Sequence, residues 1–332
     1  RPAQGEAAAA MSDMRSSVRA VALMPGTGEY ALSTTPEHHG EGLGVNRSIN
    51  VNSPSGRTDF VTSLDNLGGE LPECRAVSLI VSWFGDDLRC GACSLRPKVE
   101  QTEYEGQVRP WAVAGTDRAG AGAVDMLAGR PVYGGTPSDH SVVEAIAALR
   151  AAGQAVMFYP FILMEQMAGN GRADPWSDAP DQPVLPWRGR ITCSVAPGRA
   201  GSPDRSAAAD AEVAAFFGTV APSDFTVAGG QVHYSGPPEW SYRRFILHYA
   251  ALCAAAGGVE AFCIGSEMRG LTTIRGAGDS FPAVAQMQAL LHDVRAILGP
   301  DCKLTYAADW SEYSGFADAQ GNRYFHLDPL WS

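Results

Sequence analysis

The sequence predicts an α/β fold, an incomplete (β/α)8 TIM barrel in which about five of the eight strands are present. Strand-like and helix-like segments alternate from about residue 46, which is the pattern of a parallel sheet with crossover helices. The strand-like segments are nearly continuous apolar runs, as expected for strands covered on both faces. The chain has 332 residues, of which 45% are hydrophobic. It is therefore long enough for a barrel, which needs about 250 residues.

Two regions are expected along the chain. Residues 1–44 are rich in Ala, Gly, Ser and Thr and are predicted to form a connecting arm, in which residues 18–23 could form one strand. Residues 45–332 are predicted to form the front portion of the barrel. The strands expected there lie at residues 48–51, 76–84, 155–163, 259–264 and 303–308. The helices expected between them lie at residues 58–67, 136–153, 239–256 and 281–298.

Local signals support the helix boundaries. The run Thr136-Pro-Ser-Asp139 is predicted to be a capping box, and Gly299-Pro300 are predicted to stop the last helix. Residues 164–237 contain many prolines and glycines and interrupt the alternation of strand-like and helix-like segments. Within this insertion, residues 207–217 are predicted to be helical and residues 225–234 to form a hairpin. An insertion after a barrel strand lies at the C-terminal face, where active sites are built. We therefore predict a lid over the strand ends, with Trp187 and Arg188 facing the strand mouth.

Glu267 is the strongest candidate for a catalytic residue. It comes directly after the strand expected at 259–264, so its carboxylate is predicted to point into the mouth of the barrel. Glycoside hydrolysis needs two such carboxyl groups, one of them an acid/base. The alternative is a structural role, in which Glu267 caps a helix or forms an ion pair, for example with Arg269.

Aromatic and acidic residues near other strand ends are candidates for substrate binding. Asp309, Trp310 and Glu312 follow the fifth strand, and a ring that stacks on a sugar beside an acid that binds hydroxyls is typical of a sugar site. The alternative for these three is a loop that caps the next element. The other candidates for contact with a substrate are Trp83, Tyr159, Trp187, Arg188 and Tyr306. For Trp83, Tyr159, Trp187 and the further aromatic Trp176, packing of the lid is the alternative.

Composition excludes several classes of function. The net charge is −11, and an acidic chain repels phosphate backbones, so no nucleic-acid partner is expected. There is no apolar run of about 20 residues, as a membrane span requires. Glycine-rich nucleotide motifs are absent, so no cofactor is expected. Residues 1–10 lack the basic-then-apolar pattern of a secretory signal.

The chain has seven cysteines, an odd number scattered through apolar segments. This pattern favours reduced thiols and synthesis in the cytoplasm. Cys90 and Cys93 have C-x2-C spacing, but no second pair stands at zinc-binding distance along the chain. We therefore expect no metal site.

Six segments occur in order at spacings that resemble one family. They are residues 77–91, 134–146, 156–161, 174–194, 262–272 and 304–313. Together they resemble the TIM-barrel-like domain of gene transfer agents, which is part of a large phage-tail-like baseplate, or host-specificity, protein. The similarity covers residues 45–332. It implies that other tail and baseplate proteins and a cell-surface glycan are the partners, and that the protein works in the tail of a virion-like particle released on lysis.

A more distant similarity is to retaining, mannanase-like glycoside hydrolases. It rests on the segments at residues 187–191, 242–250 and 262–267. The resemblance implies that Glu267 is the acid/base, and that the partner nucleophile comes from the seventh strand, which this chain is not expected to reach. Three possibilities stay open: a baseplate barrel that binds or cleaves glycan, a free glycoside hydrolase without its C-terminal half, and a catalytically inert structural barrel.

Overall fold

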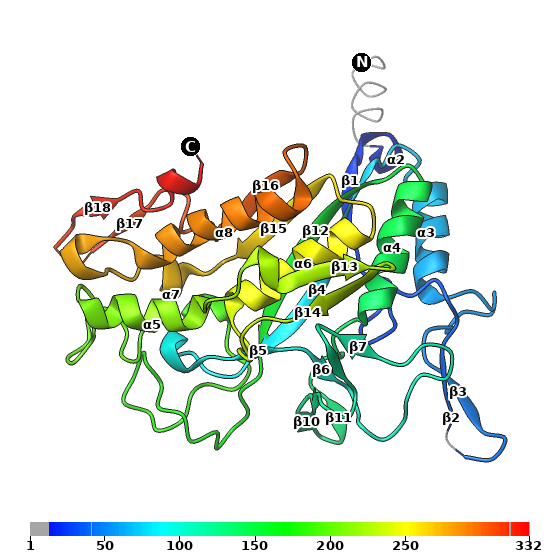
Figure 1. Cartoon of the computed structure of the whole chain (residues 1–332), viewed down its shortest axis with the longest axis horizontal. Coiled ribbons are helices and arrows are strands. Elements are labelled where there is room, and N and C mark those ends of the chain that lie inside the picture. Colours follow the sequence, from blue (N-terminus) through cyan, green and yellow to red (C-terminus); the bar gives the residue numbers. More distant parts are fainter. Residues whose placement is uncertain (1–12, 41, 319, 332) are drawn as a thin grey trace, which may run out of the picture.

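A parallel sheet forms the centre of the molecule. The computed structural model describes residues 13–40, 42–318 and 320–331. Five neighbouring strands run parallel in chain order: β1 (Ala20–Leu23), β4 (Ala76–Gly85), β12 (Ala155–Met164), β15 (Ala261–Ser266) and β16 (Lys303–Ala307). The four longer strands confirm the prediction of adjacent parallel strands with helices between them. This order is that of an incomplete α/β barrel (Figure 1).

The first strand is not the one that the sequence pattern indicated. β1 lies within the segment expected to be a connecting arm, and it pairs with β4 so that Ala20 is opposite Ala76. The strand expected at 48–51 is absent; instead β3 (Asn46–Ser48) pairs antiparallel with β2 (His38–Gly40) in a separate hairpin. β1 falls within residues 18–23, which could form a strand by their pattern, but only the pairing with β4 makes it the first strand of the sheet. Residues 1–12 of the expected arm lie outside the described residues.

Four crossover helices pack on one face of the sheet: α3 (Asp59–Glu70), α4 (Asp139–Ala151), α6 (Tyr242–Ala255) and α8 (Pro282–Leu298) (Figure 1). The Thr58 hydroxyl accepts a hydrogen bond from the Val61 N–H and caps α3. The capping box predicted at Thr136 is wrong. Ser138 is the N-cap residue of α4, and the Thr136 hydroxyl instead donates to the Ser82 carbonyl of β4 at 2.9 Å.

The remaining elements are short. The helices are α2 (Met14–Ser17), α5 (Ala207–Phe217) and α7 (Arg269–Thr272). The strands are β5 (Leu95–Arg96), β6 (Lys98–Val99), β7 (Ala112–Val113), β8 (Thr116–Asp117), β9 (Gly122–Ala123), β10 (Met126–Leu127), β11 (Arg130–Pro131), β13 (Phe225–Ala228), β14 (Gln231–Tyr234), β17 (Phe316–Ala317) and β18 (Arg323–Tyr324). Within the described ranges, no helix combines the length and apolar content needed to cross a membrane.

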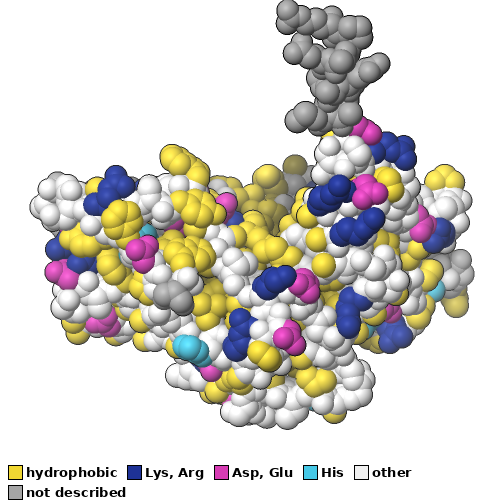
Figure 2. Space-filling view, turned by 90° about the horizontal axis from the view of Figure 1, so that it is seen from above, with side chains coloured by type: hydrophobic (Ala, Val, Ile, Leu, Met, Phe, Trp, Pro, Cys, Tyr) yellow, Lys and Arg dark blue, Asp and Glu magenta, His cyan; other side chains and the backbone are white. Residues whose placement is uncertain are grey.

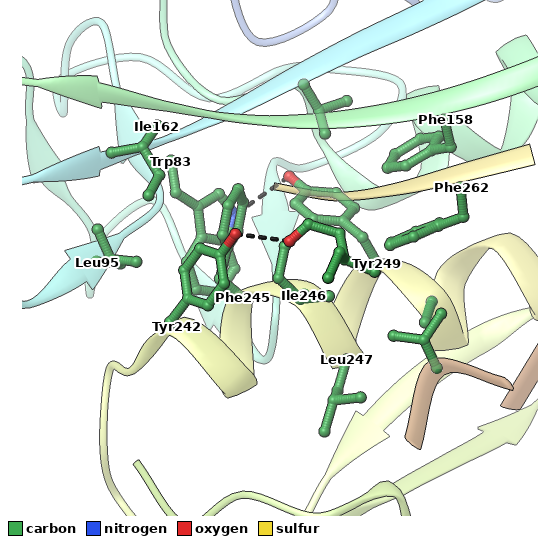
Figure 3. Close-up of a cluster of buried hydrophobic side chains, with 14 of the residues drawn as sticks. Trp83, Leu95, Phe158, Ile162, Tyr242, Phe245, Ile246, Leu247, Tyr249 and Phe262 are labelled. Atoms are coloured by element: carbon green, nitrogen blue, oxygen red, sulfur yellow. Dashed lines mark hydrogen bonds between the residues drawn. The ribbon is translucent and has the colours of Figure 1, made fainter. Parts of the chain in front are cut away.

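Aromatic side chains fill the space between the sheet and α6 (Figure 3). Phe158 of β12 and Phe262 of β15 stack with ring centroids 5.8 Å apart. The Tyr249 ring of α6 lies 5.3 Å from that of Phe158, and its hydroxyl accepts a hydrogen bond from the Trp83 indole at 3.1 Å. This packing fixes which face of each strand meets the helices.

The opposite face of the sheet is only half-buried. Side chains alternate along a strand, so the residues between the buried ones of β4 and β12 point away from the helices. Ile80, Tyr159 and Phe161 are among these half-buried residues. Hydrophobic side chains also reach the surface across the middle of the molecule when it is seen from above, with charged side chains scattered among them (Figure 2).

The insertion at 164–237 divides into two parts. The segment that contains Trp187 and Arg188 reaches the C-terminal end of β15, as predicted for a lid. The β13–β14 hairpin, by contrast, packs on α6, and the Phe225 ring lies 6.5 Å from that of His248 in α6. The prediction that the whole insertion is a lid is therefore wrong for its last part, because the hairpin buries its apolar side against the helix layer.

Candidate functional site

Glu267 stands directly after β15, at the C-terminal end of the strand. Its backbone N–H donates to the Ala307 carbonyl of β16 at 2.9 Å, which continues the sheet by one further bond. The register between β15 and β16 shifts between Cys263 and Ser266, and Glu267 has a φ of +52°. A positive φ is uncommon for a residue with a side chain and tends to occur at functional sites. The local bulge therefore turns the side chain of Glu267 away from the course of the strand.

Two donors from the lid hold the Glu267 carboxylate. The Trp187 indole N–H lies 2.9 Å from Oε2, and a terminal nitrogen of the Arg188 guanidinium lies 2.8 Å from the same oxygen. The Glu267 side chain stays 39% exposed, so the carboxylate is held in place but open to solvent. A hydrogen bond from a charged donor to a carboxylate is stronger than one from a neutral donor.

Arg188 is buried, with 6% of its side chain exposed. It donates to the Ser266 carbonyl and the Ser266 hydroxyl, each at 2.9 Å, and its guanidinium lies 3.8 Å from the centre of the Phe161 ring. Burial lowers the pKa of Arg188 from its ordinary value, and the nearby charge of Glu267 opposes that shift. The arginine thus ties the lid to the end of β15 and to the half-buried face of β12.

Tyr159 joins this group from β12. Burial raises the pKa of Tyr159, and the interaction of its hydroxyl with Ser266 opposes the rise. We refer to Tyr159, Phe161, Trp187, Arg188, Ser266 and Glu267 as the Glu267 cluster. The sequence pattern identified four of its members. It missed Phe161 and Ser266, although Phe161 shares a strand face with Tyr159, two residues away.

Two candidates for substrate binding are buried in the protein instead. Trp83 has no exposed surface and packs in the layer between β4 and α6, where its ring lies 5.1 Å from that of Phe245. Tyr306 is 3% exposed, and its hydroxyl accepts from the Met268 N–H at 2.7 Å and donates to the Glu312 carboxylate. The structure corrects both predictions: the two rings are buried inside the protein and are not exposed to a ligand.

The loop after β16 contains one exposed ring and two constrained acids. Trp310 is 84% exposed, which leaves it free to meet a ligand. The Asp309 carboxylate accepts from the Ser311 N–H and hydroxyl; burial opposes ionisation, but these bonds and the charge of Arg269 outweigh it and lower the pKa of Asp309. Glu312 is buried and accepts from Tyr306, Thr272 and the Asp309 N–H, so it has the loop-capping role.

The cysteines form no disulfide and no metal site in the described part of the chain. All seven are buried free thiols, including Cys90 and Cys93. Within residues 13–40, 42–318 and 320–331, no group of three or more His, Cys, Asp or Glu side chains could hold a metal ion. The groups available for chemistry at the strand ends are thus a carboxylate, an arginine and aromatic rings.

The C-terminal part of the chain, which includes Glu267, carries a family signature. Residues 240–332 match the GTA TIM-barrel-like domain. The match begins just before α6 and includes β15, Glu267, α8 and β16. The parallel sheet agrees with a TIM-barrel-like fold of this kind.

Solved structures give a weaker similarity. Two structures of a GH113 beta-1,4-mannanase, one of them a complex, each share 16% sequence identity with this chain at a TM-score of 0.35. Each alignment covers 76% of this chain and 50% of the mannanase chain, so the chain spans about half the length of these proteins. No curated protein matches the sequence.

Proposed function

We propose that this chain is part of a baseplate protein of a phage-tail-like particle, a gene transfer agent, and that its glycosidase-like barrel binds or cleaves cell-surface glycan during attachment or penetration. The observation that supports it best is the Glu267 cluster. It presents a half-exposed carboxylate, two donors and aromatic rings at the C-terminal ends of the strands. In α/β barrels that end of the strands is where ligands bind. The GTA TIM-barrel-like signature over residues 240–332 supports the biological setting.

Binding is the first role that we assign to Glu267. Both donors meet Oε2, and the Glu267 side chain stays open to solvent, where a ligand can reach it. An ionised carboxylate accepts hydrogen bonds from sugar hydroxyls or acts as a base, whereas a general acid must hold a proton near neutral pH. Glu267 would act as acid/base if a longer barrel brings a second carboxylate to about 5–5.5 Å, the separation in retaining enzymes.

The glycan-binding proposal can be tested with the chain as it stands. Isothermal titration calorimetry with a set of neutral and acidic oligosaccharides should give binding that Glu267→Gln and Trp187→Phe weaken by about tenfold, a loss of roughly 1.4 kcal/mol. The matched control is Glu260→Gln, which removes an equally charged but exposed side chain at the other end of β15. Binding that is absent for every glycan would contradict the proposal and favour an inert structural barrel.

Catalysis requires a separate measurement. Chromogenic β-glycosides are incubated with this chain and with the longer parent protein, each with its Glu267→Gln variant. A free or particle-bound glycosidase should release the chromophore and lose that activity on substitution of Glu267. Hydrolysis that persists in Glu267→Gln would remove this residue from the mechanism, and binding without hydrolysis would assign the barrel to recognition.

The tail location is tested on particles. An antibody against this chain, viewed by electron microscopy on particles released by lysis, should label one end of the tail. Label that stays with the cytosol of lysing cells would contradict the baseplate role.

A further inference from the structure

A groove of about 1070 Å³ lies beside the Glu267 cluster. Its walls come from the lid between Trp176 and Arg205, from α7, and from the loop after β16. Trp187 belongs to both the groove and the Glu267 cluster, because its ring lines the groove while its N–H donates to Glu267. A ligand that extends from Glu267 along the lid therefore enters this groove.

The groove is basic although the chain is acidic. The charged side chains that line it are five arginines and two aspartates, whereas the whole chain has a net charge of −11. Four of the arginines are already in ion pairs: Arg190 with Asp174, Arg199 with Asp178, Arg205 with Asp279 and Asp318, and Arg275 with Asp279. These pairs shape the walls and leave little free charge.

Arg269 is the exception. It is exposed at the start of α7, and its guanidinium makes no hydrogen bond or ion pair with any residue in the described part of the chain. Its charge acts on Asp309 only through space, as one of the causes that lower the pKa of that carboxyl. An arginine with its donors unused beside a groove is suited to bind a carboxylate with two parallel hydrogen bonds.

Two tryptophan rings lie in the same groove, each more than one-third exposed. Trp176 is fixed by the hydrogen bond from its indole N–H to the Arg190 carbonyl at 2.7 Å. Trp187 is fixed by its bond to Glu267. Rings held in one orientation offer a stacking surface at little cost in conformational entropy.

Two glycines, Gly189 and Gly270, allow the lid and α7 to pack closely at the groove. A Cβ on Gly189 would lie 2.4 Å from the Trp187 ring, and a Cβ on Gly270 would lie 2.6 Å from the Ile191 carbonyl. A side chain at Gly270 would push α7 away from the lid, and a side chain at Gly189 would displace the Trp187 ring, so both glycines keep the groove in its present form.

We propose that this groove binds an acidic glycan, with the carboxylate of a uronic acid on Arg269 and sugar rings against Trp176 and Trp187. The inference rests on the proposed glycan function and specifies the class of glycan. A planar carboxylate with one charge matches one free guanidinium, and Asp204 and Asp318 in the groove walls disfavour a doubly charged group, such as a phosphate monoester, at the same position.

The test compares glycans that differ only at C6. Calorimetry is run with β-1,4-linked mannuronate hexamer against mannohexaose, and with galacturonate hexamer against the matching neutral galactose hexamer. Wild-type chain should bind the acidic member of at least one pair about tenfold more tightly at 50 mM salt, as charge-assisted hydrogen bonds predict. Arg269→Gln should reduce that preference to about threefold or less while neutral binding stays unchanged. The control Arg130→Gln removes the same charge from the β10–β11 hairpin and should leave the preference intact.

The outcomes separate the two proposals. Equal affinity for acidic and neutral members overturns the acidic preference and leaves glycan binding standing. Failure to bind any of the four contradicts both the proposed function and this inference. A full preference in Arg269→Gln, with an unchanged melting temperature, overturns the assignment of the carboxylate to Arg269.

Discussion

The indole N–H of Trp187 lies 2.9 Å from the carboxylate of Glu267, although 80 residues separate them along the chain. This bond joins the lid to the end of β15, and the neighbouring Arg188 reinforces it with an ion pair to the same oxygen at 2.8 Å. The acid at the strand end and the aromatic wall are therefore one structural unit.

Glu267 and Arg188 are expected to be energetically coupled. Glu267→Gln leaves the buried guanidinium without its counter-charge and should lower the free energy of unfolding by about 2 kcal/mol. Adding Arg188→Met should cost less than the sum of the two single changes, because no unpaired charge remains. Urea unfolding of the wild type, the two single variants and the double variant measures the coupling. Glu260→Gln, which breaks the exposed pair with Lys303, should change stability by less than about 0.5 kcal/mol. Strictly additive effects at Glu267 and Arg188 would contradict the pairing.

Substitutions of Trp83 and of Trp310 should have opposite effects on stability and on glycan affinity. Trp83→Phe removes buried volume and the hydrogen bond to Tyr249, so the free energy of unfolding should fall by about 2 kcal/mol while glycan affinity is kept. Trp310→Ala acts on an exposed ring and should alter stability by no more than about 0.5 kcal/mol. If Trp310 stacks on a sugar, its loss should weaken glycan binding by about tenfold. Thermal unfolding and calorimetry on both variants decide this, and the reverse pattern would refute the placement of the two rings.

The buried His326 should make the protein less stable in acid. Burial lowers the pKa of His326 from 6.5 to about 4, so the unfolded chain takes up this proton at a higher pH than the folded chain does. The free energy of unfolding is then highest above pH 6.5 and decreases as the pH falls from 6.5 to about 4, by roughly 3 kcal/mol from this group. Urea unfolding at a series of pH values should show a flatter profile for His326→Gln. The exposed His292→Gln serves as control and should retain the wild-type slope.

The thiols are expected to be unreactive in the folded protein. All seven cysteines are buried, and burial raises the pKa of Cys93 and Cys253, while Cys90 is raised by its contact with Cys193 and by burial. Since the thiolate is the reactive form, the aromatic disulfide reagent DTNB should label almost none of the thiols at pH 7.5 and all seven after denaturation. Rapid labelling of one thiol before unfolding would show that its segment is more open than the structure indicates.

The sequence pattern alone determined the main strands and the crossover helices. The runs that became β4 and β12 are long, apolar and bounded by turn residues, so their periodicity identifies them without any knowledge of partners. The same reasoning identified Glu267, because a carboxylate just after a buried strand is placed at the strand mouth by connectivity. It also paired Trp187 and Arg188 with that mouth, from the position of the insertion.

Tertiary structure alone decided the rest, because the remaining features depend on partners distant in sequence. Residues 18–23 could form a strand by their pattern, but only the pairing with β4 makes β1 the first strand of the sheet. Trp83 and Tyr159 look alike as aromatic residues near strand ends, yet the pleat turns one toward α6 and the other toward the open face. The sequence does not distinguish Arg269 from the other arginines of the groove. The difference appears only in the structure, where the other four form ion pairs with aspartates. Local sequence fixes what a residue can do, and the packing of distant segments decides which residues stay free to do it.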